Sequence, residues 1–278
     1  MNAPEQTSLS AATDMRRTLD AAAVQQLTDR IEAAQTGARA IPKLTDDFPG
    51  MTLGDGYAVQ LELLRRWRAA GRRQAGWKAG LTSKAKMVQM GVTVPSIGFL
   101  LADFARAEGS TVRTDDLVHP RVECEVAFVT KADLAGPDVT RAQVLAATDF
   151  VVPAIEVIDS RFSGFKFDLP SVVADNGSSA RYVTGGRALR ADGLELDCLG
   201  VVLEKNGEPV AMGASTAVMG HPADAVALLV KVLHELGETL PAGSFVMSGG
   251  ITEAIAVKPG DVVCARFQEL GSVAVRFA

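Results

Sequence analysis

Two glutamates spaced two positions apart, Glu123 and Glu125, lie at the start of the predicted strand Glu123–Lys131. Successive side chains of a strand point to opposite faces, so both carboxylates project to one side and Cys124 points to the other. Neighbouring carboxylates repel each other, and one of them must hold a proton unless a cation lies between them. The spacing therefore predicts a cation site.

A third acid, Glu156, lies in the predicted strand Phe150–Ile158 between Ile155 and Val157. A carboxylate in such an apolar, buried strand needs a partner. Three acids with no nearby His or Cys ligand suit a hard cation better than zinc. Glu123, Glu125 and Glu156 together predict a site for Mg²⁺ or Mn²⁺.

Spacing alone leaves two other interpretations open. Paired glutamates on a strand often form a solvated outer face, since charged side chains are mostly exposed. Glu156 could also form a salt bridge with Arg121 or Arg161 instead of binding a metal ion.

The elements that must position these acids change in character along the chain. Apolar residues at helical spacing predict helices over Ala21–Ala34 and Leu53–Ala70. From about Gly76 onward, short β-rich runs bounded by Gly and Pro predict strands. Besides the two strands above, these are Arg181–Gly185, Gly200–Lys205, Pro209–Ser215, Ser244–Ser248, Asp261–Arg266 and Ser272–Phe277.

Two more helices and one hairpin complete the pattern. Thr140 is a suitable cap for a helix that ends near Thr148, and Pro222 is a suitable first residue for a helix that ends at Leu236. Asn206-Gly207 between two predicted strands is typical of a two-residue hairpin turn. We predict an α+β protein with a flexible tail (1–20), an N-terminal helical subdomain (21–75) and a mostly β catalytic domain (76–278).

Composition excludes several classes of function. The chain has 278 residues, 47% of them hydrophobic, and a formal net charge of -5, which argues against nucleic acid as the main partner. Three cysteines without CxxC spacing indicate unpaired thiols in a reducing compartment. The first twenty residues lack the apolar core of a signal peptide, and no apolar run approaches the roughly 20 residues of a membrane span. We expect a cytoplasmic protein.

Several short motifs are spread over most of the chain. They are Gly76–Ser83 (GWKAGLTS), Met90-Gly91-Val92, Gly98, His119–Glu125, Pro153–Val157, Val173–Asn176 and Gly220-His221-Pro222. Together they resemble the fumarylacetoacetate hydrolase-like fold, and within it the hydratase/decarboxylase branch of the meta-cleavage degradation of aromatic compounds. This resemblance covers residues 21–278 and implies a metal ion held by Glu123, Glu125 and Glu156.

Two further stretches, Phe165–Leu169 and Ser248–Ala254, are similar to the members of this branch that decarboxylate 2-oxo-3-hexenedioate (4-oxalocrotonate). The resemblance implies a Mg²⁺-dependent carboxy-lyase that releases CO2 and 2-hydroxypenta-2,4-dienoate from a small 2-oxo dicarboxylic acid. The alternatives are a 2-hydroxypenta-2,4-dienoate hydratase and a non-catalytic scaffold for that hydratase. A carbon–carbon hydrolase would need a base such as a His with an acid partner, which we cannot place here.

Lys78, between Trp77 and Gly80, is the predicted catalytic residue. A partly buried amine there would hydrogen-bond the developing enolate oxygen or transfer a proton. A surface lysine whose stem covers Trp77 is the alternative.

Other polar residues are weaker candidates for substrate binding. The acid and amide of Asp175-Asn176 would otherwise form a turn before Gly177, and His119 and His221, each followed by Pro, are expected to have structural roles. The resemblance also implies a homo-oligomer and a complex with the cognate hydratase. The predicted substrate-binding residues are Asp175, Asn176, Ser248, Arg161 and Lys166.

Overall fold

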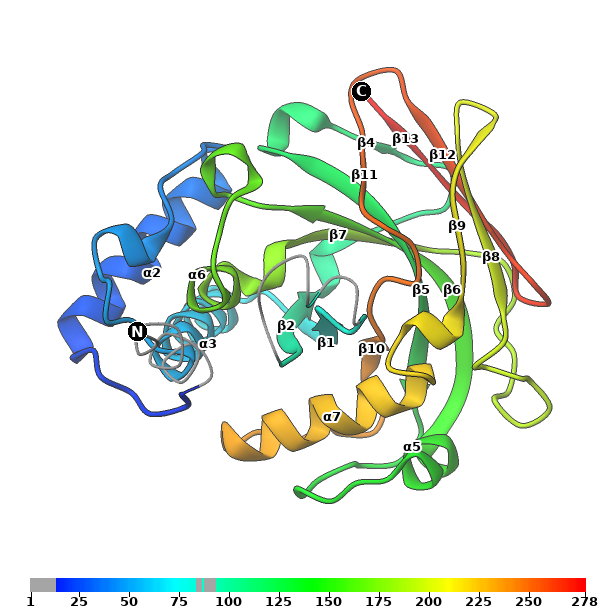
Figure 1. Cartoon of the computed structure of the whole chain (residues 1–278), viewed down its shortest axis with the longest axis horizontal. Helices are drawn as coiled ribbons and strands as arrows, with labels where there is room; N and C mark the ends of the chain where they lie inside the picture. The colour runs from blue at the N-terminus through cyan, green and yellow to red at the C-terminus, as the bar shows by residue number, and fades with distance from the viewer. Residues whose placement is uncertain (1–13, 84–86, 88–93) are drawn as a thin grey trace, which may run out of the picture.

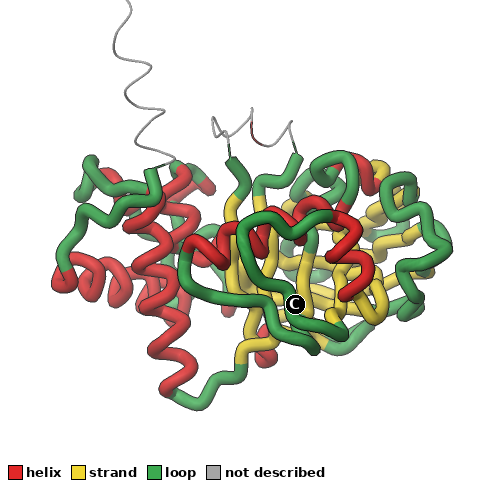
Figure 2. Tube along the Cα trace, turned by 90° about the horizontal axis from the view of Figure 1, so that it is seen from below, coloured by secondary structure: helices red, strands yellow, loops and turns green. Residues whose placement is uncertain are grey.

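The computed structural model describes residues 14–83, 87 and 94–278, and the Met90-Gly91-Val92 motif lies outside them. The fold is α+β, as predicted. Helices α2 (Ala21–Thr36) and α3 (Leu53–Ala69) lie side by side at one end of the molecule, and curved sheets form the rest (Figure 1). Seen from below, the helical end and the strand-rich end remain separate (Figure 2).

The two N-terminal helices begin at side-chain caps. The Asp20 carboxylate accepts the Ala23 N–H at the start of α2. At the start of α3, Thr52 and Asp55 form a reciprocal capping box, which satisfies backbone donors that the first turn leaves unpaired. The buried stripe of α2, which includes Leu27 and Ile31, then packs against α3. Both predicted helices are confirmed.

The predicted tail is described only from residue 14 onward, because residues 1–13 lie outside the described part. The described portion is bound to the start of α3. Asp14 accepts the Gly54 N–H through its backbone oxygen at 2.9 Å, and Thr18 donates its N–H and its hydroxyl to the Asp55 carboxylate.

The larger sheet has the strand order β2-β1-β10-β5-β6-β7-β3, with β11 paired to β5. Its central pair, β5 and β6, is antiparallel and is formed by its longest strands. These strands are β1 (Gln74–Gly80), β2 (Ser96–Leu101), β3 (Ala105–Arg106), β5 (Pro120–Thr130), β6 (Thr148–Asp159), β7 (Ser179–Thr184), β10 (Phe245–Met247) and β11 (Ile255–Ala256).

The second sheet has the order β4-β13-β12-β8-β9. Asn206 and Gly207 join β8 to β9 with φ of 56° and 87°, the positive angles that a tight hairpin turn requires, so the predicted hairpin is confirmed. The strands of this sheet are β4 (Thr111–Val112), β8 (Gly200–Lys205), β9 (Glu208–Ala214), β12 (Val262–Phe267) and β13 (Gly271–Phe277).

Each predicted strand overlaps an observed one, but β1, β2 and the two-residue strands β3, β4 and β11 were not predicted as strands. The sequence of β1, QAGWKAG, is rich in small residues and lacks a clear alternation. At Gly76 a Cβ atom would lie 1.8 Å from the Phe245 carbonyl oxygen, so only glycine permits this close approach of β1 to β10. The residues of β2 are all buried and therefore do not alternate either.

Within the described ranges, three further helices pack on the rest of the fold. α5 (Arg141–Ala147) begins at a Thr140 capping box, and α7 (Pro222–Glu235) begins with Pro222 after the His221 cap, as predicted. The short α6 (Leu169–Ala174) was not predicted; it packs against α3. The stretch Ser215–Glu235 is by length and composition apolar enough to cross a membrane, but half of it is buried inside the protein, where α7 packs on β1 and β2. It has the features of a core helix.

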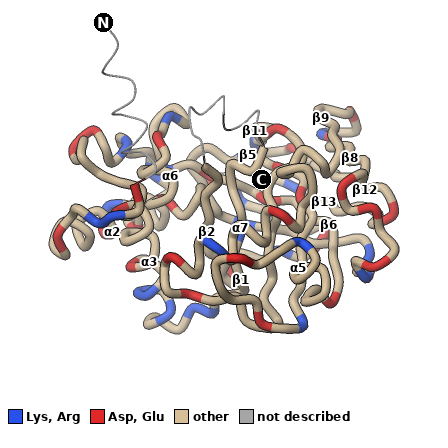
Figure 3. Tube along the Cα trace, turned by 60° about the horizontal axis from the view of Figure 1, so that its bottom comes forward, with Lys and Arg blue, Asp and Glu red and all other residues tan. Residues whose placement is uncertain are grey.

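Charge is mixed over the described part of the fold. Lys and Arg occur together with Asp and Glu at both the helical and the strand-rich end (Figure 3). This distribution agrees with the modest net charge of -5.

Candidate functional site

The pairing of β5 with β6 brings the three predicted acids together. Glu123 lies directly opposite Glu156 in the antiparallel register, and Glu125 lies two residues further along the same face of β5. Their exposed fractions are only 7% for Glu123, 0% for Glu125 and 1% for Glu156. The alternative of a solvated outer face is therefore wrong.

Lys78 on β1 reaches the same place. Its Nζ lies 2.7 Å from Oε2 of Glu156 and 3.1 Å from the Gly177 carbonyl oxygen. The side chain is 3% exposed, so the alternative of a surface lysine is wrong. The salt-bridge partner of Glu156 is Lys78 rather than either arginine proposed from the sequence.

The two arginines make other contacts. The Arg121 guanidinium lies 4.1 Å from the centroid of the Phe165 ring, a cation–π geometry. Arg161 is buried and forms an ion pair with Asp175.

Two glycines, Gly98 and Gly177, lie close to the Lys78 side chain. A Cβ at Gly98 on β2 would lie 2.7 Å from the Asn176 carbonyl oxygen and 3.2 Å from Lys78 Cγ. At Gly177 a Cβ would be 3.9 Å from Lys78 Cε, an ordinary contact, but the φ of +58° there still favours glycine. The lysine stem therefore runs between two backbone segments that approach it closely.

Acidic groups outnumber the one basic group among these four residues. Burial and the neighbouring Glu156 raise the pKa of Glu125 well above its usual value. Burial also raises the pKa of Glu156, although Lys78 opposes this. Burial lowers the pKa of Lys78, but the attraction of Glu156 and Glu125 outweighs it, and the net shift is upward. Lys78 is therefore protonated, and a cation beside Glu125 and Glu156 would favour their ionised forms.

Two oxygens of this cluster remain without hydrogen bonds in the described part of the chain. Oε2 of Glu125 accepts the Gly249 N–H at 2.7 Å. Oε1 of Glu125 and Oε1 of Glu156 are buried and have no hydrogen-bond partner there. An unsatisfied buried carboxylate oxygen is costly, so both atoms suit a cation.

The donor set therefore fits a hard divalent ion. Oxygen ligands are those that Mg²⁺ prefers. Among the described residues, no group of three or more His, Cys, Asp or Glu side chains is arranged so that it could hold a metal ion as it stands. The fit thus rests on the chemistry of the donors and on the two bare oxygens of Glu125 and Glu156.

The other predicted residues have different surroundings. Ser248 is buried and donates its hydroxyl to the Val126 carbonyl at 2.8 Å. Asn176 is buried and hydrogen-bonded to the backbone of Phe99. Lys166 is exposed after β6. Among the predicted substrate-binding residues, Asn176 directly precedes Gly177, whose carbonyl oxygen accepts a hydrogen bond from Lys78.

Sequence reasoning missed Thr82 and Gly249. The Thr82 hydroxyl is buried without a hydrogen-bond partner among the described residues, and a Cβ at Gly249 would lie 2.1 Å from it. Gly249 also has a φ of +107°, which side chains rarely adopt. Both residues lie in stretches named above, Gly76–Ser83 and Ser248–Ala254. Nothing in the sequence shows that these two stretches are in contact.

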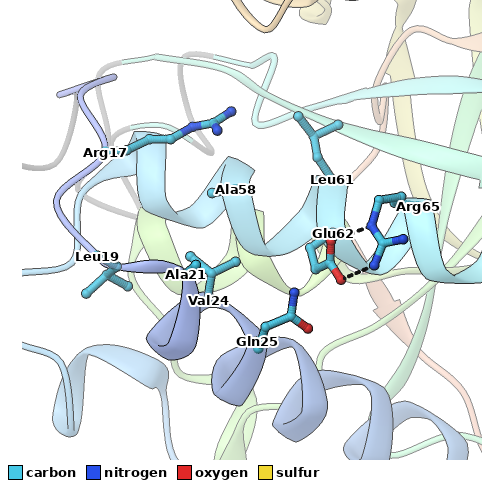
Figure 4. Close-up of a pocket in the computed structure, with 9 residues that line it drawn as sticks. All are labelled: Arg17, Leu19, Ala21, Val24, Gln25, Ala58, Leu61, Glu62 and Arg65. Carbon is cyan, nitrogen blue, oxygen red and sulfur yellow. Dashed lines mark hydrogen bonds and ion pairs between the residues drawn. The ribbon is translucent and has the colours of Figure 1, made fainter.

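A surface pocket of ≈ 440 Å³ lies elsewhere, between the start of α2 and α3 (Figure 4). It is partly lined by an ion pair of the α3 surface, Glu62 with Arg65. None of the predicted site residues lines it. Its lining residues are Arg17, Leu19, Ala21, Val24, Gln25, Ala58, Leu61, Glu62 and Arg65.

Comparison with known proteins agrees with this geometry. Residues 66–278, more than half of the chain, match the family described as fumarylacetoacetate (FAA) hydrolase C-terminal. The chain belongs to the fumarylacetoacetate hydrolase family. Within this family it is 54% identical to a 4-oxalocrotonate decarboxylase of Pseudomonas sp. (strain CF600), over 95% of this chain and 100% of the relative.

Other members of the fumarylacetoacetate hydrolase family are also similar. A 2-keto-4-pentenoate hydratase of Paraburkholderia xenovorans (strain LB400) is 39% identical over 88% of this chain and 91% of its own. A solved structure of 4-oxalocrotonate decarboxylase from Pseudomonas putida G7, complexed with magnesium and adipate, superposes with a TM-score of 0.93 at 50% identity. That match covers 95% of this chain and 100% of the other.

Proposed function

We propose that this protein is a Mg²⁺-dependent 4-oxalocrotonate decarboxylase. The observation that carries the proposal is the buried group formed by Lys78, Glu123, Glu125 and Glu156. Identity of 54% to a 4-oxalocrotonate decarboxylase, against 39% to a hydratase, favours this reaction within the family.

The reaction removes the C6 carboxylate of 2-oxo-3-hexenedioate as CO2. The C5–C6 bond breaks, and its electron pair forms the C4=C5 double bond. The C3=C4 pair moves to C2=C3, and the C2 carbonyl oxygen takes up the negative charge. Protonation of that oxygen gives 2-hydroxypenta-2,4-dienoate. The enzyme must therefore stabilise charge that develops on one oxygen atom.

Three carboxylates are the proposed metal ligands: Glu123, Glu125 and Glu156. Bound there, Mg²⁺ would supply Lewis-acid stabilisation at the substrate's 2-oxo acid end. Gly249 holds Oε2 of Glu125 through its N–H, which leaves Oε1 of that carboxylate for the ion.

Lys78 is the proposed catalytic residue. An ammonium group has three N–H donors. Glu156 Oε2 and the Gly177 carbonyl accept two of them. We assign the third to the C2 oxygen of the substrate, where it would stabilise the enolate and provide its proton.

The distal carboxylate needs separate recognition. Lys166 is exposed and carries the charge for this role, whereas the Ser248 and Gly249 N–H groups already donate to Val126 and Glu125. Arg161, Asp175 and Asn176 are engaged with protein groups. Their contribution to substrate binding is therefore proposed to be indirect.

Purified enzyme tests the proposal directly. With Mg²⁺ and 2-oxo-3-hexenedioate, we expect release of one CO2 per substrate, and EDTA should abolish it. Incubation with 2-hydroxypenta-2,4-dienoate should leave the dienol absorbance unchanged. Loss of dienol absorbance without CO2 release from the first substrate would instead identify a hydratase, and inactivity on both would favour the scaffold.

The remaining parts of the proposal concern assembly and location. We propose a cytoplasmic homo-oligomer that associates with the hydratase that consumes its product. Analytical ultracentrifugation of the protein alone, and then mixed with that hydratase, measures both forms of assembly. Sedimentation as independent monomers in both samples would contradict this part alone.

A further inference from the structure

Three consecutive residues after α6 have left-handed backbone angles. Asn176, Gly177 and Ser178 have φ of 55°, 58° and 59°. Left-handed conformations are visited mainly by glycine and Asn, and usually by single residues rather than by a run. Such a run persists only when the surrounding structure holds it, and it is typical of functional sites.

The first hold on this turn is the side chain of Asn176. Its Oδ1 accepts the Phe99 N–H at 2.7 Å, and its Nδ2 donates to the Phe99 carbonyl at 3.0 Å. Both ends of the amide are thus bound to the backbone of β2. Asn176 is fully buried, so neither hydrogen bond competes with solvent.

The second hold is Arg161, which contacts the residues that flank the turn on both sides. Its Nε donates to Oδ1 of Asp175 at 2.5 Å, and its Nη2 donates to the Asp175 carbonyl at 2.6 Å. On the far side, its Nη1 donates to the Ser179 carbonyl at 3.4 Å. The guanidinium is 2% exposed, so its charge is matched inside the protein.

The turn contacts Lys78. The Gly177 carbonyl, in the middle of the left-handed run, accepts from Lys78 Nζ at 3.1 Å. The Lys78 stem also passes Gly98, where a Cβ would meet the Asn176 carbonyl. Left-handed angles at three residues therefore direct one backbone oxygen at the ammonium.

We propose that the left-handed turn Asn176–Ser178 is the positioning device for Lys78. Asn176 and Arg161 are positioning residues that act through the Gly177 carbonyl. This inference rests on the proposed function, because it assumes that Lys78 meets the substrate. Glu156 alone leaves the ammonium free to rotate about one contact, whereas two acceptors fix the direction of its third N–H.

The first experiment compares two asparagines with the same local chemistry. Asn206 also has a left-handed φ and binds through both ends of its amide, to Val262 and Asp261, but it lies in the β8–β9 turn. We expect Asn176→Ala to lower kcat at least tenfold with less than a threefold change in KM. Asn206→Ala should leave both within twofold. Mg²⁺ affinity should stay within twofold in both variants.

A double-mutant cycle shows whether Asn176 acts through Lys78. The readout is the affinity of the Mg²⁺-loaded enzyme for 2-oxoadipate, measured by calorimetry. This probe carries the C2 oxygen but lacks the C3=C4 double bond, so it is not turned over. We expect Asn176→Ala to weaken 2-oxoadipate binding at least threefold in the wild-type background. In the Lys78→Ala background the same change should alter affinity by less than twofold.

Several outcomes would overturn the proposal. These are an Asn176→Ala variant with kcat and 2-oxoadipate affinity within twofold of wild type, or an equal loss of affinity in both backgrounds. If Asn176→Ala does not fold, Asn176→Gly keeps the left-handed angle, removes the amide and enters the same tests. A wild-type enzyme that releases no CO2 but shows the coupled 2-oxoadipate result would refute the decarboxylase and leave the positioning turn in place.

Discussion

Nζ of Lys78 lies 2.7 Å from Oε2 of Glu156, and both side chains are almost completely buried. Removing one partner of a buried pair leaves an uncompensated charge, which typically costs about 3–5 kcal/mol. Glu123 and Glu125 lie beside this pair, on one face of β5. The cluster thus combines a stability requirement with two bare carboxylate oxygens, on Glu125 and Glu156, that suit a cation.

Lys78→Met tests both parts of this relationship. We expect kcat for CO2 release to fall by about 10²–10³, the effect of losing one preorganised donor. In the absence of Mg²⁺ the free energy of unfolding should fall by about 3 kcal/mol, because the buried Glu156 carboxyl loses its partner. Urea unfolding measures the latter. Lys166→Met, at an exposed lysine, is the control for stability, and a Lys78→Met enzyme with half the wild-type kcat would contradict the assignment.

Glu125→Gln and Glu156→Gln test the proposed metal ligands. Each change removes one negative charge and one strong oxygen ligand, so we expect Mg²⁺ binding to weaken at least tenfold, about 1.4 kcal/mol. Isothermal titration calorimetry measures this directly. Glu208→Gln, on the exposed edge of β9, carries the same chemical change away from the cluster. Unchanged Mg²⁺ affinity in both cluster variants would place the metal elsewhere.

Gly249→Ala tests the contact between Gly249 and Thr82, which follows β1. The new Cβ would lie 2.1 Å from the Thr82 hydroxyl, and the backbone would keep an unfavourable φ. We expect a loss of about 1–3 kcal/mol in stability and weaker Mg²⁺ binding, since the Gly249 N–H holds Glu125. Gly243→Ala is matched to it, with a positive φ of +80° but open space around the Cβ. Equal thermal shifts in the two variants, with equal Mg²⁺ affinity, would mean that the Thr82 contact has no effect.

His221 predicts a pH dependence of stability. Its Nδ1 accepts the Ala223 N–H at the start of α7, and burial, followed by the charge of Arg141, lowers its pKa below the ordinary 6.5. Between the folded and unfolded pKa values the unfolded chain binds more protons, so the contribution is full above pH 6.5 and is lost as the pH falls below it. Loss of a cap typically costs about 0.5–2 kcal/mol.

Denaturant unfolding at several pH values between 5 and 8 measures this dependence. His221→Asn supplies a capping oxygen that does not titrate, so its curve should be flatter than that of the wild type below pH 6.5. His234→Asn changes an exposed histidine at the other end of α7 and should keep the wild-type slope. Parallel curves for wild type and His221→Asn would exclude the cap as the source.

Local rules predicted part of this site. The period of two in a strand places Glu123 and Glu125 on one face, and the apolar neighbours of Glu156 indicate its burial. That Glu156 lies opposite Glu123 depends on the register of β5 and β6, which the sequence does not display. The chemistry of the three acids predicted one hard-cation site, and the family resemblance implied the same three residues as metal ligands.

Long-range pairing accounts for most of what was missed. Lys78 was recognised as a candidate, but its strand was not, because the small residues of β1 serve close packing against β10. Arg161 was expected at the substrate and is instead paired with Asp175 inside the protein. A six-residue helix such as α6 contains too few turns for a clear apolar period.

The acceptor that the turn presents to Lys78 is a main-chain oxygen, the carbonyl of Gly177. Scanning mutagenesis exchanges side chains, so none of its variants removes this main-chain oxygen. The lysine can lose that interaction only if the peptide unit itself is altered or swings away. Replacing the Gly177–Ser178 amide by an ester weakens this carbonyl as an acceptor and leaves all neighbouring side chains as they are. It also removes the Ser178 N–H, which donates to the Asp175 carbonyl.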